Sequence, residues 1–390
     1  MFAPFFFPSS NGQTSLLLAM ATVSLTFISR PIGGIFFGHF GDRIGRKSVW
    51  LYTLVGIGIA SILIGFLPTF QQVGLIATVA LIALRLCQGF FFAGEEAGGW
   101  VLTVESAPSK WRGFSGSIVG IGAGLGQVLL SISILLASTL APGSEFSVWG
   151  WRIIFWFGAV PFILALIFRW KISESVEWKA KAASKVEKIP LVAAFKNNKK
   201  FFIITLIAFF GQTFFIYGSI IFLPSFLKLY TTNSPSAIAT IVLVANVAVM
   251  FGSPIWGYLS DKMKSRRTFL TLAFLINASI LYPLIFVFNL GIVGFSIFAA
   301  IALGFINPTT TGILPSWITE NTRTSARYSA IASARSMGQA IGGLAPYTVV
   351  LLSATLGPVF GTALISIIGC LSAVIAIPFS PADRVGKTLE

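Results

Sequence analysis

Long uninterrupted apolar stretches are the feature that most constrains what this chain can fold into. Eleven such stretches recur along the 390 residues, and a helix needs about 20 apolar residues to cross a hydrocarbon core ~30 Å thick. Their expected limits are 16–37, 49–67, 75–103, 114–137, 153–170, 201–227, 238–259, 268–288, 291–314, 329–353 and 358–379. The sequence therefore predicts an all-α membrane protein with about eleven spans.

Composition excludes other classes of protein. Hydrophobic residues make up 55% of the chain and charged residues only 10%, whereas soluble domains carry roughly 25% charge. The stretches also lack the alternation that a transmembrane barrel requires. The formal net charge of +15 does not indicate nucleic-acid binding, because the basic residues lie between the spans and form no single patch. Cys87, Cys370 and the single histidine, His39, have no metal-ligand spacing, so we expect neither metal nor cofactor.

Basic residues are concentrated in alternate connections between the spans and in the tail. Cytoplasmic connections of membrane proteins are enriched in Lys and Arg. We therefore expect a multi-pass protein of the plasma membrane with its C-terminus in the cytoplasm. The longest polar connection, 171–200, holds eight lysines and is interpreted as a linker between two halves. We expect an N-terminal bundle over 1–170 with a truncated first helix, a cytoplasmic linker over 171–200, a C-terminal bundle over 201–380 and a cytoplasmic tail over 381–390.

Two loop motifs occur twice at nearly the same offset. A glycine followed four residues later by an aspartate and then by basic residues occurs at Gly38 and again at Gly257, 219 residues later. A glutamate followed seven residues later by an arginine occurs at Glu105 and again at Glu320, 215 residues later. Both repeats indicate a duplication, and parallel repeats are typical of transporters built from two helical bundles.

Eight short stretches carry recognisable motifs: residues 30–34, 38–47, 85–89, 94–95, 105–108, 112–113, 149–152 and 174–175. Together they resemble the major facilitator superfamily, and specifically its metabolite:proton symporter branch. The resemblance implies two bundles of six helices each, here with the first helix largely missing, and transport without enzymatic activity. The family's first helix carries a Tyr–Asp pair that this chain lacks.

Charged residues inside the spans are candidates for binding substrate or protons. A charge at the membrane centre costs roughly 2.5–3.5 kcal/mol on insertion scales, so each needs a partner or a water-filled cavity. Arg85, Gln88 and Glu96 share one helical stripe, since eleven residues end about 20° past three turns. The family resemblance favours Glu95 as the proton-carrying acid, and the stripe favours Glu96. Further candidates, each with an ordinary structural alternative such as an ion pair or an interhelical hydrogen bond, are Arg30, Arg335, Gln212, Tyr217, Asn246 and Asn307.

The repeated loop motifs predict a cytoplasmic gate. A carboxylate there can cap the N-terminus of a neighbouring helix and can pair with arginines across the interface between the bundles. We expect Glu105 with Arg112, and Glu320 with Arg327, to act as breakable latches. The full set of candidate gate residues is Gly38, Asp42, Arg43, Arg46, Glu105, Arg112, Asp261, Arg266, Glu320 and Arg327.

The leading hypothesis is a monomeric, proton-coupled importer of a small organic anion or zwitterion that works by alternating access. One alternative is a truncated relative that does not transport, or a solute sensor of the same fold. Another is a sugar facilitator, which is less favoured because the spans contain few Gln or Asn residues. Protons and the lipid bilayer are the other expected partners.

Overall fold

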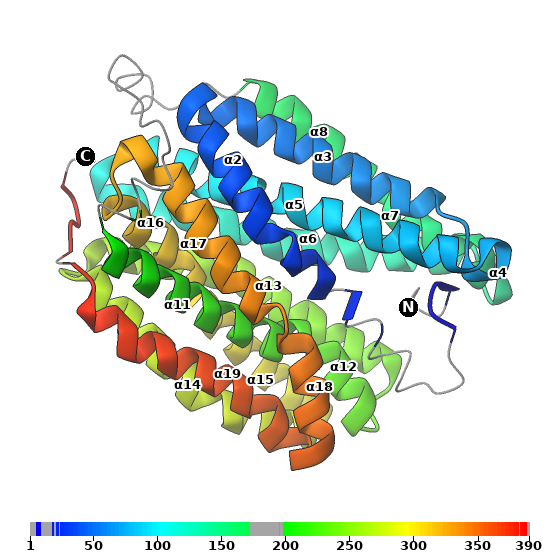
Figure 1. Ribbon diagram of the computed structural model, residues 1–390. Helices are drawn as coiled ribbons and strands as arrows, with labels where there is room; N and C mark the ends of the chain where they lie inside the picture. Colours follow the sequence, from blue (N-terminus) through cyan, green and yellow to red (C-terminus); the bar gives the residue numbers. More distant parts are fainter. Residues whose placement is uncertain are drawn as a thin grey trace.

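The computed structural model describes residues 5–8, 18, 21–22, 24–171, 195, 198–381 and 383–387, and the regular structure in these residues is helical. The helices lie side by side in a bundle (Figure 1). Ten helical stretches in the described part are long and apolar enough to cross a membrane. They correspond to ten of the eleven predicted spans, and the remaining one, 16–37, falls partly outside the described residues. The predicted all-α membrane fold is confirmed.

Helices of the N-terminal half fill the upper part of Figure 1. The long helix α5 carries every charged residue predicted inside the third span. The elements are α2 (Arg30–Ile44), α3 (Arg46–Phe66), α4 (Phe70–Val73), α5 (Leu75–Glu105), η2 (Ser109–Trp111), α6 (Arg112–Leu140), η3 (Phe146–Gly150), α7 (Trp151–Phe157) and α8 (Ala159–Lys171). The predicted linker, 171–200, lies almost wholly outside the described residues.

Two spans of the C-terminal half are interrupted near their middle. One breaks at Pro308, whose missing N–H cannot continue the helical ladder, and the other breaks at Gly343. The elements are α11 (Lys199–Ile216), η4 (Tyr217–Ile221), α12 (Leu223–Tyr230), α13 (Pro235–Lys262), α14 (Arg266–Asn289), α15 (Val293–Ile306), α16 (Pro308–Glu320), η5 (Thr324–Ala326), α17 (Arg327–Gly342), α18 (Ala345–Leu356), α19 (Pro358–Ala376) and η6 (Ile377–Phe379).

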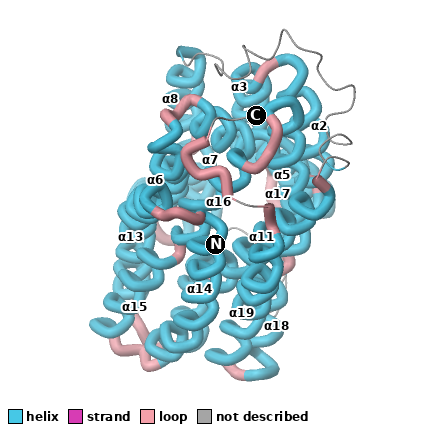
Figure 2. Tube along the Cα trace, turned by 90° about the vertical axis from the view of Figure 1, so that its left-hand side faces the viewer, coloured by secondary structure: helices cyan, strands magenta, loops and turns pink. Residues whose placement is uncertain are grey.

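The two halves meet along two matching helix pairs. Helix α2 packs against α17, and α6 packs against α13; Figure 2 shows the second pair side by side. The second pair crosses at two glycines: a Cβ on Gly113 would lie 2.4 Å from the carbonyl oxygen of Gly257, and one on Gly257 would lie 2.5 Å from that of Gly113. In the first pair, a Cβ on Gly38 would lie 2.8 Å from Cα of Ser329. Glycine therefore sets the close approach of the halves at both interfaces.

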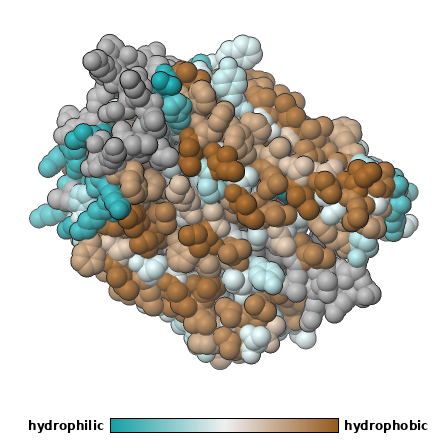
Figure 3. Space-filling model, viewed as in Figure 1, coloured by the Kyte–Doolittle hydropathy of each residue, from teal (hydrophilic) through white to brown (hydrophobic). Residues whose placement is uncertain are grey.

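Hydrophilic residues gather at one end of the molecule, whereas apolar side chains cover most of the face seen in Figure 3. We call this the basic end; it includes the chain reversals after α2, α5, α13 and α16, with exposed Lys110, Lys264 and Arg323. Helices α5 and α16 run on to Glu105 and Glu320, beyond the predicted limits of 103 and 314. They extend further because those carboxylates pair with arginines of other helices and so remain inside the bundle.

Candidate functional site

The first charged cluster at the basic end joins α2, α3 and α5 to the start of α17. Asp42 accepts hydrogen bonds from the backbone N–H groups of Tyr328 (3.1 Å) and Ser329 (2.9 Å), so it caps a helix of the other half. Glu105 forms ion pairs with Arg46 and, at 2.5 Å, with Arg327. The side chains of Arg46, Arg327 and Glu105 are fully buried. Acid and base therefore neutralise each other across the interface.

The second cluster repeats this arrangement with the two halves exchanged. Asp261 accepts hydrogen bonds from the backbone N–H groups of Gly113 (2.7 Å) and Phe114 (2.8 Å), at the start of α6. Arg266 bridges Asp261 at 2.7 Å and Glu320 at 2.8 Å. Each half thus caps the N-terminus of one helix in the other half, where a negative charge is favourable.

The ion pairs of the predicted latches are crossed between the halves. Arg327 pairs with Glu105 at 2.5 Å, and Arg112 lies 3.9 Å from Glu320. The predicted pairing of Glu105 with Arg112 and of Glu320 with Arg327 is therefore wrong in its partners. Arg112 and Arg327 are the first residues of α6 and α17, and each of these helices packs against the other half. Among the candidate gate residues, Arg43 stands apart, because it is exposed and contacts His39 at 3.2 Å.

A third cluster lies between the halves, about two and a half helical turns from the basic end. Glu96 of α5 forms an ion pair with Arg335 of α17, whose Nε also donates to a Glu96 oxygen at 2.7 Å. Gln339 donates to Glu96 at 3.4 Å and accepts from Arg30 of α2 at 2.8 Å. These contacts link both halves at a depth of about 12–14 Å along the helices, at 1.5 Å per residue. We call this group the central site.

Aromatic rings cover both arginines of the central site. The guanidinium carbon of Arg335 lies 3.8 Å from the ring centre of Trp100 and 5.2 Å from that of Phe209. The guanidinium carbon of Arg30 lies 3.9 Å from the ring centre of Phe27. Cation–π contacts of this kind stabilise a desolvated cation. Two arginines and one glutamate leave an excess of one positive charge, which suits a carboxylate ligand.

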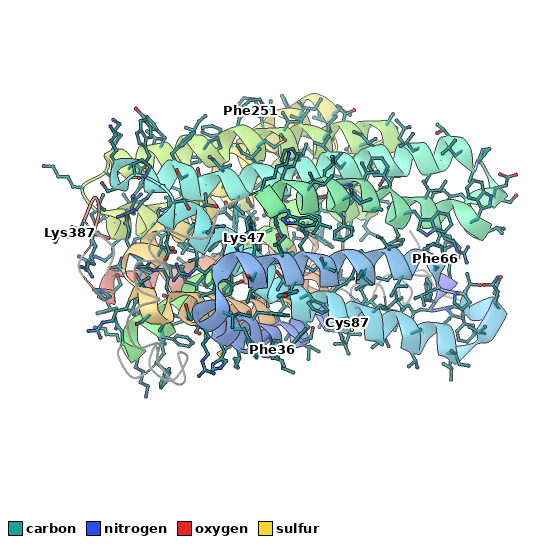
Figure 4. All side chains as sticks on the ribbon, turned by 90° about the horizontal axis from the view of Figure 1, so that it is seen from above. Phe36, Lys47, Phe66, Cys87, Phe251 and Lys387 are labelled. Carbon is teal, nitrogen blue, oxygen red and sulfur yellow. The ribbon has the colours of Figure 1, made fainter. Side chains whose placement is uncertain are left out.

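The other charged candidates on α5 lie away from this site. Glu95 forms an ion pair with Arg169 of α8, within the N-terminal half. Arg85 donates to Gln88 at 3.0 Å, and Gln88 donates to Ser61 of α3 at 2.8 Å. The three residues of the predicted stripe therefore do not meet. Arg85 and Gln88 pair within α5, whereas Glu96 lies at the interface between the halves. Next to that stripe, Cys87 points outward from the bundle (Figure 4).

The polar candidates of the C-terminal half also divide. The ring centre of Tyr217 lies 5.1 Å from that of Phe27, the ring that covers Arg30, and so Tyr217 belongs to the central site. Asn246 donates to the Val242 carbonyl of its own helix at 2.9 Å. Gln212 and Asn307 are buried, and within the described residues their amide nitrogens have no hydrogen-bond partner. No described hydrogen bond joins these last three residues to Glu96.

Two residues of the central site escaped the sequence analysis. Gln339 lies one turn after Arg335, and Trp100 lies one turn after Glu96. A search for polar or aromatic side chains at helical spacing from each buried charge would have found both. In the described part of the chain, no three His, Cys, Asp or Glu side chains gather as metal ligands.

Two helical bundles that cap each other at one end and share a charged site between them define a membrane transport fold. The sequence profile of the Major Facilitator Superfamily matches residues 1–346 and, in a second match, residues 219–389. The protein belongs to the Major Facilitator Superfamily. It is therefore a multi-pass membrane transport protein and not an enzyme.

Curated relatives include bacterial transporters. The proline/betaine transporter of Escherichia coli (strain K12) is 29% identical over 352 residues, which cover 87% of this chain and 70% of that protein. The shikimate transporter of the same organism is 34% identical over 276 residues, which cover 68% of this chain and 61% of that protein. A glycine betaine/proline/ectoine/pipecolic acid transporter of Dickeya dadantii is 27% identical over 352 residues, which cover 87% of this chain and 70% of that protein.

Solved structures show the same fold. A proton:xylose symporter bound to 6-bromo-6-deoxy-D-glucose has a TM-score of 0.76 and 18% identity, and the match covers 99% of this chain and 90% of that one. A human organic anion transporter has a TM-score of 0.70 and 13% identity, and the match covers 96% of this chain and 87% of that one. At these identities the likeness concerns the fold alone.

Proposed function

We propose that this protein is a secondary active transporter that takes up a small carboxylate, either an anion or a zwitterion, together with a proton. The observation that carries the proposal is the ion pair between Glu96 and Arg335. It joins the two halves at the depth where alternating access requires a substrate site. The central site as a whole, with Arg30, Arg335 and Glu96, has an excess of one positive charge that favours a carboxylate, and proline, betaine and shikimate, named for the relatives, all carry one.

The proposed coupling follows from competition for one arginine. A substrate carboxylate that binds Arg335 takes the place of Glu96. A partly desolvated carboxylate that loses its cation favours the neutral, protonated form. Proton binding at Glu96 and substrate binding at Arg335 therefore support each other. A conformational change that opens the central site toward either side of the membrane then carries the proton and the substrate together.

We further propose that the basic end faces the cytoplasm, in the plasma membrane, and that its two clusters form the inner gate. The basic connections lie at this end, as expected for cytoplasmic loops. Reciprocal capping at Asp42 and Asp261 closes this end, and outward opening of the central site requires such closure. We propose that the transporter works as a monomer.

Uptake into proteoliposomes tests the proposal, with labelled proline, glycine betaine and shikimate as probes and a proton gradient directed inward. Glu96→Gln should abolish uphill accumulation and retain exchange of labelled for unlabelled solute, because exchange needs no net proton transfer. Glu95→Gln is the matched control and should keep its dependence on the gradient. Normal accumulation by Glu96→Gln would refute proton coupling at this residue. Binding without accumulation by the unaltered protein would favour a solute sensor.

A further inference from the structure

A cavity of about 280 Å³ opens at the basic end of the C-terminal half. Its walls come from the start of α11, the end of α16, the loop before α17, α17 itself and the tail after η6. The floor is apolar, with Phe201, Phe202, Ile318 and Ala334. Every lining residue belongs to the C-terminal half, so the cavity is separate from the central site between the halves. We call it the tail pocket.

The polar groups of the tail pocket suit an anion. Arg323 from the loop and Arg384 from the tail line it, together with the amides of Asn198 and Asn321. None of the lining residues is acidic. Two arginines and two amides, with no acid among the lining residues, therefore favour a negatively charged ligand.

The loop wall of the pocket holds two gate arginines through its backbone. The carbonyl oxygen of Thr322 accepts hydrogen bonds from Arg327, at 3.0 Å from Nε and 2.7 Å from Nη2. The carbonyl oxygen of Thr324, two residues further on, accepts one from Arg46 of the N-terminal half at 3.0 Å. A ligand that fixes this loop therefore fixes the first charged cluster.

The tail wall reaches the second cluster. Asp383 accepts a hydrogen bond from the backbone N–H of Arg267 at 3.1 Å and so caps α14. Four residues later, the carbonyl oxygen of Lys387 accepts one from Arg112 of the N-terminal half at 2.6 Å. Lys387 lies at the basic end, opposite to Phe66 (Figure 4). The tail thus spans from the C-terminal half to a gate arginine of the other half.

We propose that the tail pocket binds a small carboxylate with an apolar body and that the bound anion holds the basic end closed. A dry cavity of 150 Å³ accepts benzene, so about 280 Å³ holds a benzene-sized body with its carboxylate. The carboxylate bridges Arg323 and Arg384 with charge-assisted hydrogen bonds, and the body covers the apolar floor. Binding ties the tail to the loop and so holds both charged clusters. The closing effect rests on the proposed inner gate, whereas the binding site does not.

Equilibrium binding of labelled benzoate to the purified full chain in lipid nanodiscs tests the site. The unaltered protein should bind benzoate saturably, and Arg323→Gln and Arg384→Gln should each weaken binding about tenfold or more. Ala330→Phe fills the pocket and should abolish binding while both arginines remain. Lys264→Gln removes a basic-end charge outside the pocket and is the matched control. Inorganic phosphate, which has no apolar body, should compete poorly.

Several outcomes would overturn the site. Absence of saturable binding is one, and unchanged binding in both arginine variants is another. Loss of binding in Arg335→Gln with retention in Arg384→Gln would place benzoate at the central site. Competition by phosphate as strong as by unlabelled benzoate would show that the apolar floor is not used.

Spin labels test the closing effect independently of transport. Cysteines at Lys110→Cys and Lys387→Cys, in a chain with Cys87→Ser and Cys370→Ser, report the distance from the tail to the N-terminal half. Benzoate should increase the fraction of molecules with the short distance, and the addition of Arg384→Gln should remove this response. Saturable binding without any change in the distance distribution would refute the closing effect and leave the proposed uptake activity unaffected.

Discussion

The basic end and the central site differ in symmetry. At the basic end the helix caps and the ion pairs across the interface have counterparts in the other half: Asp42 caps α17 as Asp261 caps α6, and Glu105 meets Arg327 as Glu320 meets Arg112. At the central site the counterpart of Arg335, at the offset of 215 residues, is Gly120. The repeat therefore keeps the contacts that join the halves, whereas Arg335 between them has no charged counterpart.

The largest expected effect lies at the asymmetric site. Arg335→Gln removes the only described ion-pair partner of Glu96, whose side chain is 21% exposed. Breaking a fully buried pair costs about 3–5 kcal/mol, and a pair with one partly exposed member costs less. Uptake should fall by about tenfold to 100-fold. Arg85→Gln, a change of the same type within one half, should have a much smaller effect. Equal losses of initial uptake rate in the two variants would show that the pair across the halves has no special role.

The symmetric end predicts equal effects from equivalent changes. Glu105→Gln removes the carboxylate that pairs with Arg46 and Arg327, and Glu320→Gln removes the one that pairs with Arg266 and Arg112. Each should open the basic end to a similar extent and slow uptake, since each destabilises the closed state by a comparable free energy. The rate at which a cysteine introduced near the central site reacts from the basic side measures this opening. A strong effect of one variant and none of the other would break the proposed equivalence.

A smaller effect is expected where the helices cross. A methyl group on Gly257 would lie 2.5 Å from the carbonyl oxygen of Gly113, so Gly257→Ala forces α6 and α13 apart. Overpacking of this kind costs about 1–3 kcal/mol and should lower the thermal unfolding midpoint of the purified protein. Gly122→Ala is the control, because nothing lies within 4 Å of the added methyl group. Equal midpoints for the two variants would contradict the close crossing.

The sequence predicted the spans and the repeat well because both are local properties. A run of apolar residues marks a span whatever it packs against, and a motif of eight residues survives duplication intact. Partners across the interface could not be predicted in the same way. The motif at Glu105 and Arg112 shows that both signs are present, but not that each pairs with the other half. That crossing depends on which helices pack together.

Helical geometry also separated the two acids of α5. The wheel placed Glu96, and not Glu95, on the stripe of Arg85, while the family resemblance favoured Glu95. In the structure Glu96 faces α17 and Glu95 faces α8. Adjacent residues on a helix point about 100° apart, so only one of them can reach the interface. Gln339 and Trp100 were missed because neither carries a charge that requires explanation inside a span.

Proton uptake on substrate binding tests the central claim most directly. Proline, glycine betaine and shikimate are added in turn to the purified, unbuffered protein, and the pH change is recorded with Glu96→Gln and Glu95→Gln as the paired variants. We predict that a ligand that binds causes the unaltered protein and Glu95→Gln to take up protons, and that Glu96→Gln binds it without proton uptake. Binding without proton uptake by the unaltered protein, or undiminished proton uptake by Glu96→Gln, would contradict the exchange of Glu96 for substrate at Arg335.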